Sequence, residues 1–425
     1  MKHSYKDSNV EWLGMIPEDW EVGKIGQVYT ERREKVSDED YPPLSVTMQG
    51  IVPQLSSAAK SDAHDNRKLV LTGDFAINSR SDRRGSCGIS KYDGSVSLIN
   101  TVLQPKAKMD PNYYDWVFHS TVFADEYYKW GHGIVDDLWT TNWQDMKRIS
   151  IPIPSLPEQE KIAKFLRKEC DEIDSLIVNT RCSIEEYKRM KQIIITNATT
   201  KGLNETARKK SSGVAWVEEI PENWNVIKFK YLATDVFKGA GITKEDVKEN
   251  GEISCVRYGE IYTKYNFHFD ECKSRTNENC VSQPRYFSYG DILFTCTGEL
   301  VEEIGKAVVY LGKEKCMAGG DIIIARHKQN PIFMSYALNS DYAQSQRSYG
   351  KSKLKVVHAS AYDINNTIMI IPPIEEQQEI AIYLDEKCKE IDSIIEAKKL
   401  LAQELELYKK SLIYEYVTGK RRVVD

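Results

Sequence analysis

The feature that most constrains this chain is an internal duplication. The first copy opens at Trp12 with WLGMIPEDWEVGK, and the second opens at Trp216 with WVEEIPENWNVIK. Seven of the fourteen positions from Trp12 to Ile25 are identical, at an offset of 204 residues. Solenoid repeats have roughly 20–50 residues, so a repeat this long predicts a duplicated domain.

A second match lies near the end of each copy. Residues 158–177 read EQEKIAKFLRKECDEIDSLI and residues 376–395 read EQQEIAIYLDEKCKEIDSII, with eleven of twenty positions identical at an offset of 218. Because the offset rises from 204 to 218, the second copy is 14 residues longer between the two matches. The matching segments therefore flank two diverged parts, at residues 21–150 and 225–370.

Each later match follows a proline break and has the pattern of a long amphipathic helix. Glutamates in its first turn suit the helix dipole, and apolar residues recur at steps of three, four and seven. We expect these residues to pair the helices or to dock another subunit: Ile162, Leu166, Ile173, Ile177, Ile184, Ile380, Leu384, Ile391, Ile395 and Leu405.

The predicted helices are too long to be buried by one small domain. A helix from Glu158 to Thr200 would span about 65 Å at 1.5 Å per residue. Two equivalent helices can bury each other's apolar stripes, most simply as an antiparallel coiled coil with pseudo-two-fold symmetry. That symmetry predicts that the two ends of the chain lie near each other.

The diverged parts predict an α+β fold with mixed α/β character. Short apolar runs follow Gly-Asp turns at Asp74–Asn78 and Asp291–Thr295, as expected for strands, and residues 111–120 and 331–340 have helical patterns. We expect a first globular domain at 1–153, a spacer helix at 154–203 and an exposed linker at 204–212. A second domain at 213–370 and a second spacer helix with the C-terminal tail at 371–425 complete the order.

Composition favours a cytoplasmic protein with well-packed cores. Hydrophobic residues make up 41% of the 425 residues, and the net charge is −5. No apolar run approaches the roughly 18 residues of a membrane span, and the first ten residues lack an apolar signal core. The nine cysteines show no zinc-ligand spacing, so we expect reduced thiols and no metal.

Enzyme signatures are absent from the sequence, which favours a binding protein without catalytic residues. The GxG fragments lack a third glycine, and no Walker, amino-methyltransferase or nuclease motif occurs. Two basic clusters and a few nearby polar residues are candidates for DNA contacts, because Arg and Lys clamp phosphates and Arg reads guanine edges. They are Asn78, Arg80, Arg83, Arg84, Arg257, Tyr258, Lys351, Lys353 and Lys355, with Gln49 also near. The alternative for such clusters is a solvated, charged loop.

The doubled motifs resemble those of type I restriction–modification specificity subunits. The resemblance is carried by the two openings at 12–22 and 216–226 and by the proline-to-helix segments IPIPSLPEQ and IPPIEEQ. It is also carried by the helix ends ATTKGL at 198–203 and LIYEYVTGK at 412–420. It covers the whole chain in its order of parts and is loose inside the two globular domains.

The resemblance implies a DNA-binding subunit without catalytic activity. Each globular domain would read one half of a split site in double-stranded DNA, and the helix pair would set the spacer. Two modification subunits would bind S-adenosylmethionine and methylate adenine, and restriction subunits would use ATP and Mg²⁺; no cofactor would bind this chain. The alternatives are an orphan DNA-binding protein of this kind and a coiled-coil scaffold without restriction activity.

Overall fold

The computed structural model describes residues 4–55, 65–80, 83–106, 108–134, 139–298, 304–349 and 357–423. The chain divides into two compact units, one of residues 1–181 and 399–425 and the other of residues 182–398. Each unit contains one mixed α/β domain and one end of both long helices, α5 (Leu156–Lys201) and α10 (Ile374–Val417). The tandem duplication with two long helices is therefore confirmed.

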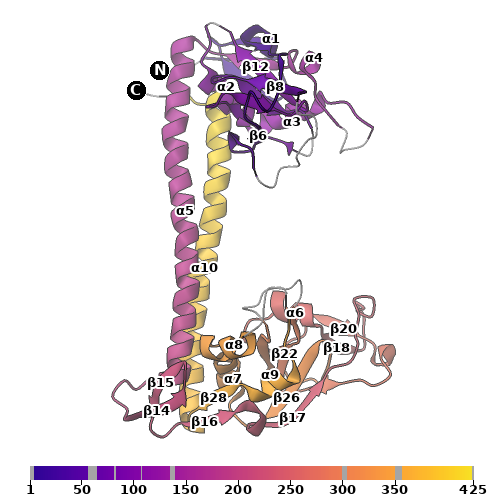
Figure 1. Ribbon diagram of the computed structural model, residues 1–425, viewed down its shortest axis with the longest axis vertical. Helices are drawn as coiled ribbons and strands as arrows, with labels where there is room; N and C mark the ends of the chain where they lie inside the picture. Colours follow the sequence, from indigo (N-terminus) through magenta and orange to yellow (C-terminus); the bar gives the residue numbers. More distant parts are fainter. Residues whose placement is uncertain are drawn as a thin grey trace. The chain divides into compact units, whose positions relative to one another are not determined.

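The domain of the first unit is built on antiparallel sheets covered by two helices (Figure 1). A four-stranded sheet has the order β10-β9-β12-β4, a three-stranded sheet has the order β11-β8-β5, and β1-β2, β6-β7 and β13-β3 form separate pairs. Its strands are β1 (Tyr5–Asp7), β2 (Met15–Pro17), β3 (Glu21–Lys24), β4 (Tyr29–Glu31), β5 (Lys35–Val36), β6 (Leu44–Thr47), β7 (Gly50–Pro53), β8 (Arg67–Val70), β9 (Phe75–Asn78), β10 (Cys87–Ile89), β11 (Gly94–Val96), β12 (Asn100–Pro105) and β13 (Ser150–Ile153). Its short helices are α1 (Ile25–Val28), α2 (Pro111–His119), α3 (Thr121–Lys129) and α4 (Trp143–Met146).

The domain of the second unit has two larger sheets, in which the pairs β18-β25 and β19-β24 are parallel and the other strand pairs are antiparallel. A five-stranded sheet has the order β17-β26-β22-β24-β19 and a four-stranded sheet has the order β20-β18-β25-β21. Its strands are β14 (Lys209–Val214), β15 (Val217–Pro221), β16 (Asn225–Lys228), β17 (Ala233–Lys238), β18 (Ile253–Val256), β19 (His268–Phe269), β20 (Ser274–Thr276), β21 (Tyr286–Phe287), β22 (Ile292–Thr295), β23 (Thr297–Gly298), β24 (Ala307–Tyr310), β25 (Cys316–Ala318), β26 (Ile322–His327), β27 (Val357–His358) and β28 (Ile368–Ile371). Its helices are α6 (Tyr258–Thr263), α7 (Pro331–Leu338), α8 (Asp341–Ser348) and α9 (Ala361–Asn366), with 3-10 turns η3 (Phe229–Tyr231) and η4 (Glu278–Cys280).

The two long helices run antiparallel within each unit. In the first unit, the start of α5 packs against the end of α10, where the rings of Phe165 and Tyr416 lie 4.5 Å apart. In the second unit, the second half of α5 packs against the first half of α10, where Ile184, Ile391 and Ile395 form a cluster. The predicted antiparallel pairing is therefore present in both units.

The repeated opening motif anchors each domain to the first turn of a long helix. The indole Nε1 of Trp20 donates a hydrogen bond to the Glu158 carboxylate at 2.9 Å, and that of Trp224 donates to Glu376 at 2.7 Å. Both tryptophans are completely buried. Through burial and this hydrogen bond, each tryptophan fixes the start of its domain to a long helix.

Each anchoring tryptophan also contacts the end of the opposite helix. Gly419 follows α10 and lies under Trp20, whereas Gly202 follows α5 and lies under Trp224. Both glycines have left-handed φ values, of 71° and 75°. A methyl group on Gly419 would lie 2.4 Å from Pro17, so the ring and the helix end pack this closely only because the residue is glycine.

The glutamine after each anchoring glutamate ties the helix to the same place in both domains. Gln159 accepts a hydrogen bond from the backbone N–H of Asp110, which caps α2, at 2.9 Å. Gln377 accepts one from the backbone N–H of Asn330, which caps α7, also at 2.9 Å. The Glu-Gln pair is repeated in the sequence because in both domains the glutamate binds the anchoring tryptophan and the glutamine binds the backbone at the start of a short helix of the domain.

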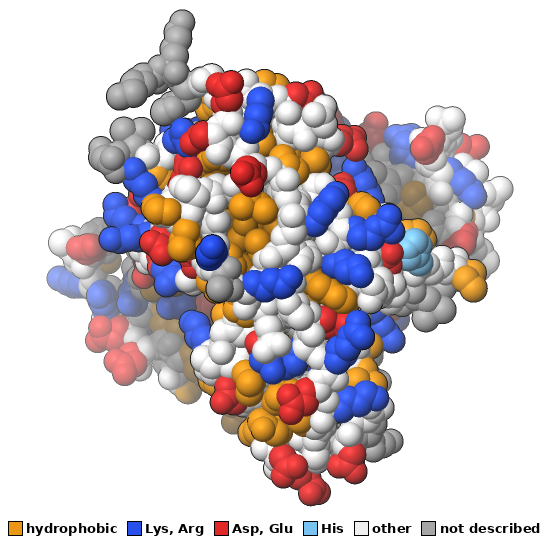
Figure 2. All heavy atoms as spheres, turned by 90° about the horizontal axis from the view of Figure 1, so that it is seen from above, with side chains coloured by type: hydrophobic (Ala, Val, Ile, Leu, Met, Phe, Trp, Pro, Cys, Tyr) orange, Lys and Arg blue, Asp and Glu red, His pale blue; other side chains and the backbone are white. Residues whose placement is uncertain are grey.

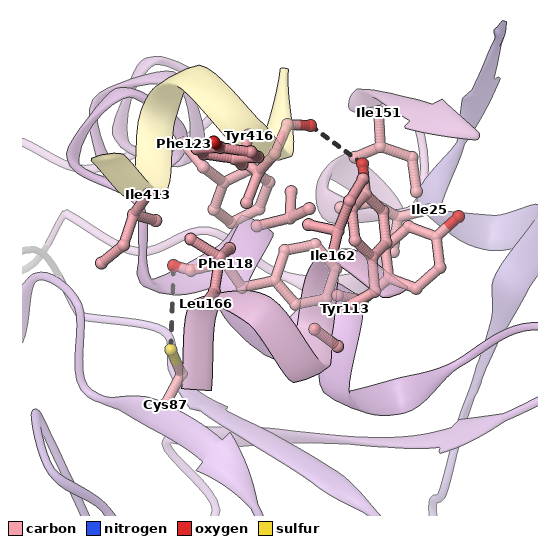
Figure 3. Close-up of a cluster of buried hydrophobic side chains, with 14 of the residues drawn as sticks. Ile25, Cys87, Tyr113, Phe118, Phe123, Ile151, Ile162, Leu166, Ile413 and Tyr416 are labelled. Carbon is pink, nitrogen blue, oxygen red and sulfur yellow. Dashed lines mark hydrogen bonds between the residues drawn. The ribbon is translucent and has the colours of Figure 1, made fainter. Parts of the chain in front are cut away.

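The core of the first domain continues onto the helix pair. Figure 3 shows Phe118 and Phe123 of the domain meeting Ile162 and Leu166 of α5, and all four are buried. The hydroxyl of Tyr113 donates to the Val417 carbonyl at the end of α10, at 2.8 Å. Each long helix is therefore part of the domain's hydrophobic core at this end.

The two chain ends meet in the first unit, as the pseudo-symmetry predicted (Figure 1). The Tyr5 hydroxyl donates to the Lys420 carbonyl at 3.2 Å, and the Lys420 ammonium donates to the Leu13 carbonyl at 2.7 Å. The Arg422 guanidinium pairs with the Glu158 carboxylate at 2.9 Å.

The linker predicted at 204–212 is wrong in its second half. Residues from Lys209 onward form β14, which pairs with β15 in an antiparallel hairpin. The side chains at 209–211 are exposed, so the prediction is right about their exposure and wrong about the backbone conformation. The hairpin corresponds to β1-β2 of the first domain, and backbone pairing stabilises it without apolar side chains at these positions.

Candidate nucleic-acid interface

The first candidate surface is the loop that follows strand β9. The buried side chain of Asn78 accepts a hydrogen bond from the backbone N–H of Arg80 at 3.0 Å. The backbone N–H of Asn78 donates to the Ser86 carbonyl at 2.9 Å, which closes the base of the loop. Asn78 is therefore the buried support of this loop, and its side-chain oxygen is already used by the backbone.

The three arginines of this loop are exposed, and their backbones and side chains make different contacts. The backbone of Arg80 forms a bridge with Thr140, and its side chain points to solvent. Arg83 is exposed, and its backbone N–H donates to the Arg80 carbonyl at 3.3 Å. The guanidinium of Arg84 lies over the ring of Tyr128, with its central carbon 3.8 Å from the ring centroid.

A small hollow joins these residues to an aromatic pair that the sequence patterns did not single out. Asn78, Arg80 and Arg84 line it together with Tyr128 and Trp139. Tyr128 lies 44 positions from Arg84, beyond the reach of any local motif. No short-range signal points to it, because the contact arises only when α3 packs beside the loop.

In the second domain, Arg257 and Tyr258 lie at the start of α6. The backbone N–H of Arg257 donates to the Glu260 carboxylate at 2.9 Å, and the buried Arg257 Nε has no hydrogen-bond partner among the described residues. Tyr258 is 42% exposed. Burial raises the pKa of Glu260, but hydrogen bonds from Lys264, Ser274 and this N–H outweigh it and lower the pKa.

The lysine cluster of Lys351, Lys353 and Lys355 lies outside the residues that the structure describes. The DNA-contact role of every candidate residue therefore stays a prediction. Gln49 is exposed in the turn between β6 and β7, beside Met48, which is 71% exposed. Figure 2 shows one face of the molecule, where Lys and Arg side chains are interspersed with acidic, apolar and uncharged ones rather than gathered into one basic patch.

The helix residues predicted to pair or dock belong to different parts of the two cores. Ile162, Leu166, Ile173 and Ile177 lie in the core of the first unit, against which the partly buried Leu405 also packs. Ile380 and Leu384 lie in the domain core of the second unit, and only Ile184, Ile391 and Ile395 form a separate helix-pair cluster. All these side chains except Leu405 are buried, so subunit docking through them stays a prediction.

The fold defines a duplicated protein in which two unlike sets of loops are carried on equivalent frameworks. Residues 17–181 and 221–406 each match the family model described as the type I restriction modification DNA specificity domain. These regions make up most of the chain, and the chain belongs to this family. Its role is that of a specificity subunit of a type I restriction–modification system, whose partners are DNA and the other subunits.

Relatives and solved structures resemble the chain over nearly its whole length. The type I restriction enzyme MjaVIII specificity subunit of Methanocaldococcus jannaschii is 26% identical, over 99% of this chain and 97% of that protein. The putative MjaX specificity subunit of the same organism is 24% identical, over 99% and 98%.

Two solved structures share the fold. One comes from work on complex assembly and conformational transition of the type I R-M system; it has a TM-score of 0.72 at 14% identity and covers 96% of this chain and 99% of the other. The HsdS subunit from Thermoanaerobacter tengcongensis has a TM-score of 0.54 at 15% identity, over 96% and 98%. Among the described residues, no helix has the length and apolar character needed to cross a membrane.

Proposed function

We propose that the two domains each read one half of a split DNA site and that the helix pair sets the distance between the halves. The observation that carries this is the repeated anchor: Trp20 and Trp224 fix both domains to the helices through the same contacts. The frameworks are thus equivalent, while the loops that would meet DNA differ. Such a protein presents two different readers at a fixed separation, as dimeric repressors present two equal ones.

We further propose how this chain divides the work with its partners. Two modification subunits would dock on the helix pair, bind S-adenosylmethionine and methylate adenine. Restriction subunits would use ATP and Mg²⁺, and this chain would hold no cofactor or metal and carry out no catalysis. Its place would be the cytoplasm, where it meets the DNA.

The experiment that tests the proposal is a methylome. The chain is co-expressed with a candidate modification subunit, and N6-methyladenine is mapped by single-molecule sequencing. We expect a split motif that appears only when both proteins are present. An assembled complex that adds no methylation would contradict the proposal, and if its DNA binding is also absent or insensitive to salt, a coiled-coil scaffold becomes the better explanation.

A further inference from the structure

The three exposed arginines of the β9–β10 loop are not equivalent, and the difference lies in what holds each guanidinium. Arg84 is stacked on Tyr128, and its Nη1 lies 3.3 Å from the Asp125 carboxylate. Its side chain nevertheless remains 49% exposed. Among the residues that the structure describes, no ring or carboxylate holds the Arg80 guanidinium in this way, whereas the Arg84 guanidinium combines a defined plane with an open edge.

The ring of Tyr128, on which Arg84 stacks, is itself held in place by Trp139. The Trp139 indole Nε1 donates to the Tyr128 carbonyl at 3.0 Å, and the two rings lie 5.6 Å apart. Trp139 packs directly on Gly131, where a Cβ would lie 2.2 Å from the indole nitrogen. The Tyr128 ring therefore lies on a framework that leaves it little freedom to tilt.

A fixed guanidinium plane is what bidentate recognition of a base requires. Arginine reads guanine by donating two parallel hydrogen bonds to O6 and N7 in the major groove, and both bonds need one orientation of the plane. A side chain that is already oriented also loses less conformational entropy on binding. Because arginine can also bind a phosphate bidentately, the choice between a base and a phosphate rests on the charge beside Arg84.

The charge beside Arg84 favours a base over a phosphate. Asp125 places a carboxylate next to the guanidinium, and the Asp125 side chain is 68% exposed to solvent. A phosphate on the same guanidinium would meet that like charge, whereas the edge of a guanine is uncharged. No carboxylate of the described part of the chain pairs with Arg80, so this side chain suits a phosphate.

We propose that Arg84 reads a guanine in the half-site of the first domain and that Tyr128, supported by Trp139, is the positioning residue that orients it. This rests on the proposed function, because it requires that the first domain binds one half of a split site. It adds which residue determines the base and which base is read. Arg80 then contributes affinity that does not depend on sequence.

The test uses the full chain co-expressed with its modification subunit and the methylome as readout. The Arg84→Lys and Tyr128→Ala variants should make one guanine position of the first half-site degenerate, with about 10-fold or greater loss of discrimination there. Tyr128→Phe keeps the ring and should leave the motif unchanged. Arg80→Ala should lower methylation at all sites alike, with the motif unchanged.

Several results separate the possible failures. The second half-site, read in the same molecules, reports whether each variant is folded and assembled. If the wild-type first half-site contains no guanine, or if Arg84→Lys lowers methylation uniformly without relaxing any position, the assignment of Arg84 is overturned while the split-site function stands. If the wild-type complex assembles but gives no split motif, the proposed function itself fails.

Discussion

A change in helix length tests the spacing role of the helix pair most directly. The boundary between the two compact units falls between residues 181 and 182 in α5 and between residues 398 and 399 in α10. Buried residues lie seven positions apart across both boundaries, at Ile177 and Ile184 and at Ile395 and Ala402. Repeating residues 178–184 in α5 and 396–402 in α10 therefore lengthens both helices without disturbing either domain or the buried stripe.

The expected size of the effect follows from helix and DNA geometry. Seven residues add about 10.5 Å of helix at 1.5 Å per residue, which equals about three base pairs at roughly 3.4 Å each. The insertion falls only about 20° short of two full helical turns, whereas three base pairs rotate the second half-site by roughly 105°. We therefore expect a spacer about three base pairs longer and slower methylation, because the DNA or the helices must absorb the rotational mismatch.

The assay is again the methylome of the co-expressed complex, read as the gap between half-sites. A seven-residue insertion after Asn250, an exposed position far from both helices in sequence, is the matched control and should leave the gap unchanged. An insertion in α5 alone shifts the antiparallel register and should prevent assembly. If a lengthened helix pair assembles and methylates sites with the original gap, the helix pair does not set the distance between the half-sites.

Three further changes test the packing and electrostatics of the domains. Trp20→Phe removes a buried hydrogen bond to a charged group and should lower the free energy of unfolding by about 1.5–3 kcal/mol, measured by urea titration; an unchanged midpoint would contradict the anchor. Gly419→Ala should lower the free energy of unfolding by more than the roughly 1–2 kcal/mol of a left-handed alanine, because its methyl group would also clash with Pro17. Gly73→Ala, at φ 91° with open space around it, is the control and should cost only that amount. Equal losses of stability in the two variants would rule out the clash with Pro17. Burial raises the pKa of Asp385, but hydrogen bonds from His268 and a tyrosine outweigh it and lower the pKa. Its stabilisation is complete above the unfolded value of about 3.9 and is lost as pH falls through the lower folded pKa, so thermal unfolding of Asp385→Asn should depend less on pH in that acid range than that of the wild type.

The architecture was predictable because its signals are repeated. The helices α5 and α10 follow from apolar residues at helical spacing, and α2 and α7 follow from a proline at the first helical position with a capping Asp110 or Asn330 before it. Both signals act within a few residues of chain. The linker prediction failed because β14 pairs through its backbone, and backbone pairing leaves no apolar pattern to detect.

The candidate site was predictable only in part, for the opposite reason. Three arginines in five positions mark the β9–β10 loop at once, but nothing in that segment distinguishes Arg84 from Arg80. The distinction comes from Tyr128 and Trp139, which reach the loop through tertiary packing. Composition locates a cluster of basic residues, whereas the orientation that we propose for base recognition depends on residues distant in sequence.

The contrast between buried anchoring residues and exposed loop residues also explains which parts of the two copies stayed alike. Trp20 and Trp224 must each fit between the start of one helix and the glycine that follows the other, so a change at any member leaves a buried hole, a steric clash or a lost buried hydrogen bond. The arginines of the β9–β10 loop are exposed and are not enclosed between two helices, so a change at one of them leaves no buried hole. A duplicated protein built this way keeps its anchors while its two readers diverge, and exchanging Arg84 for another residue should alter one base of the target without altering the spacing between the half-sites.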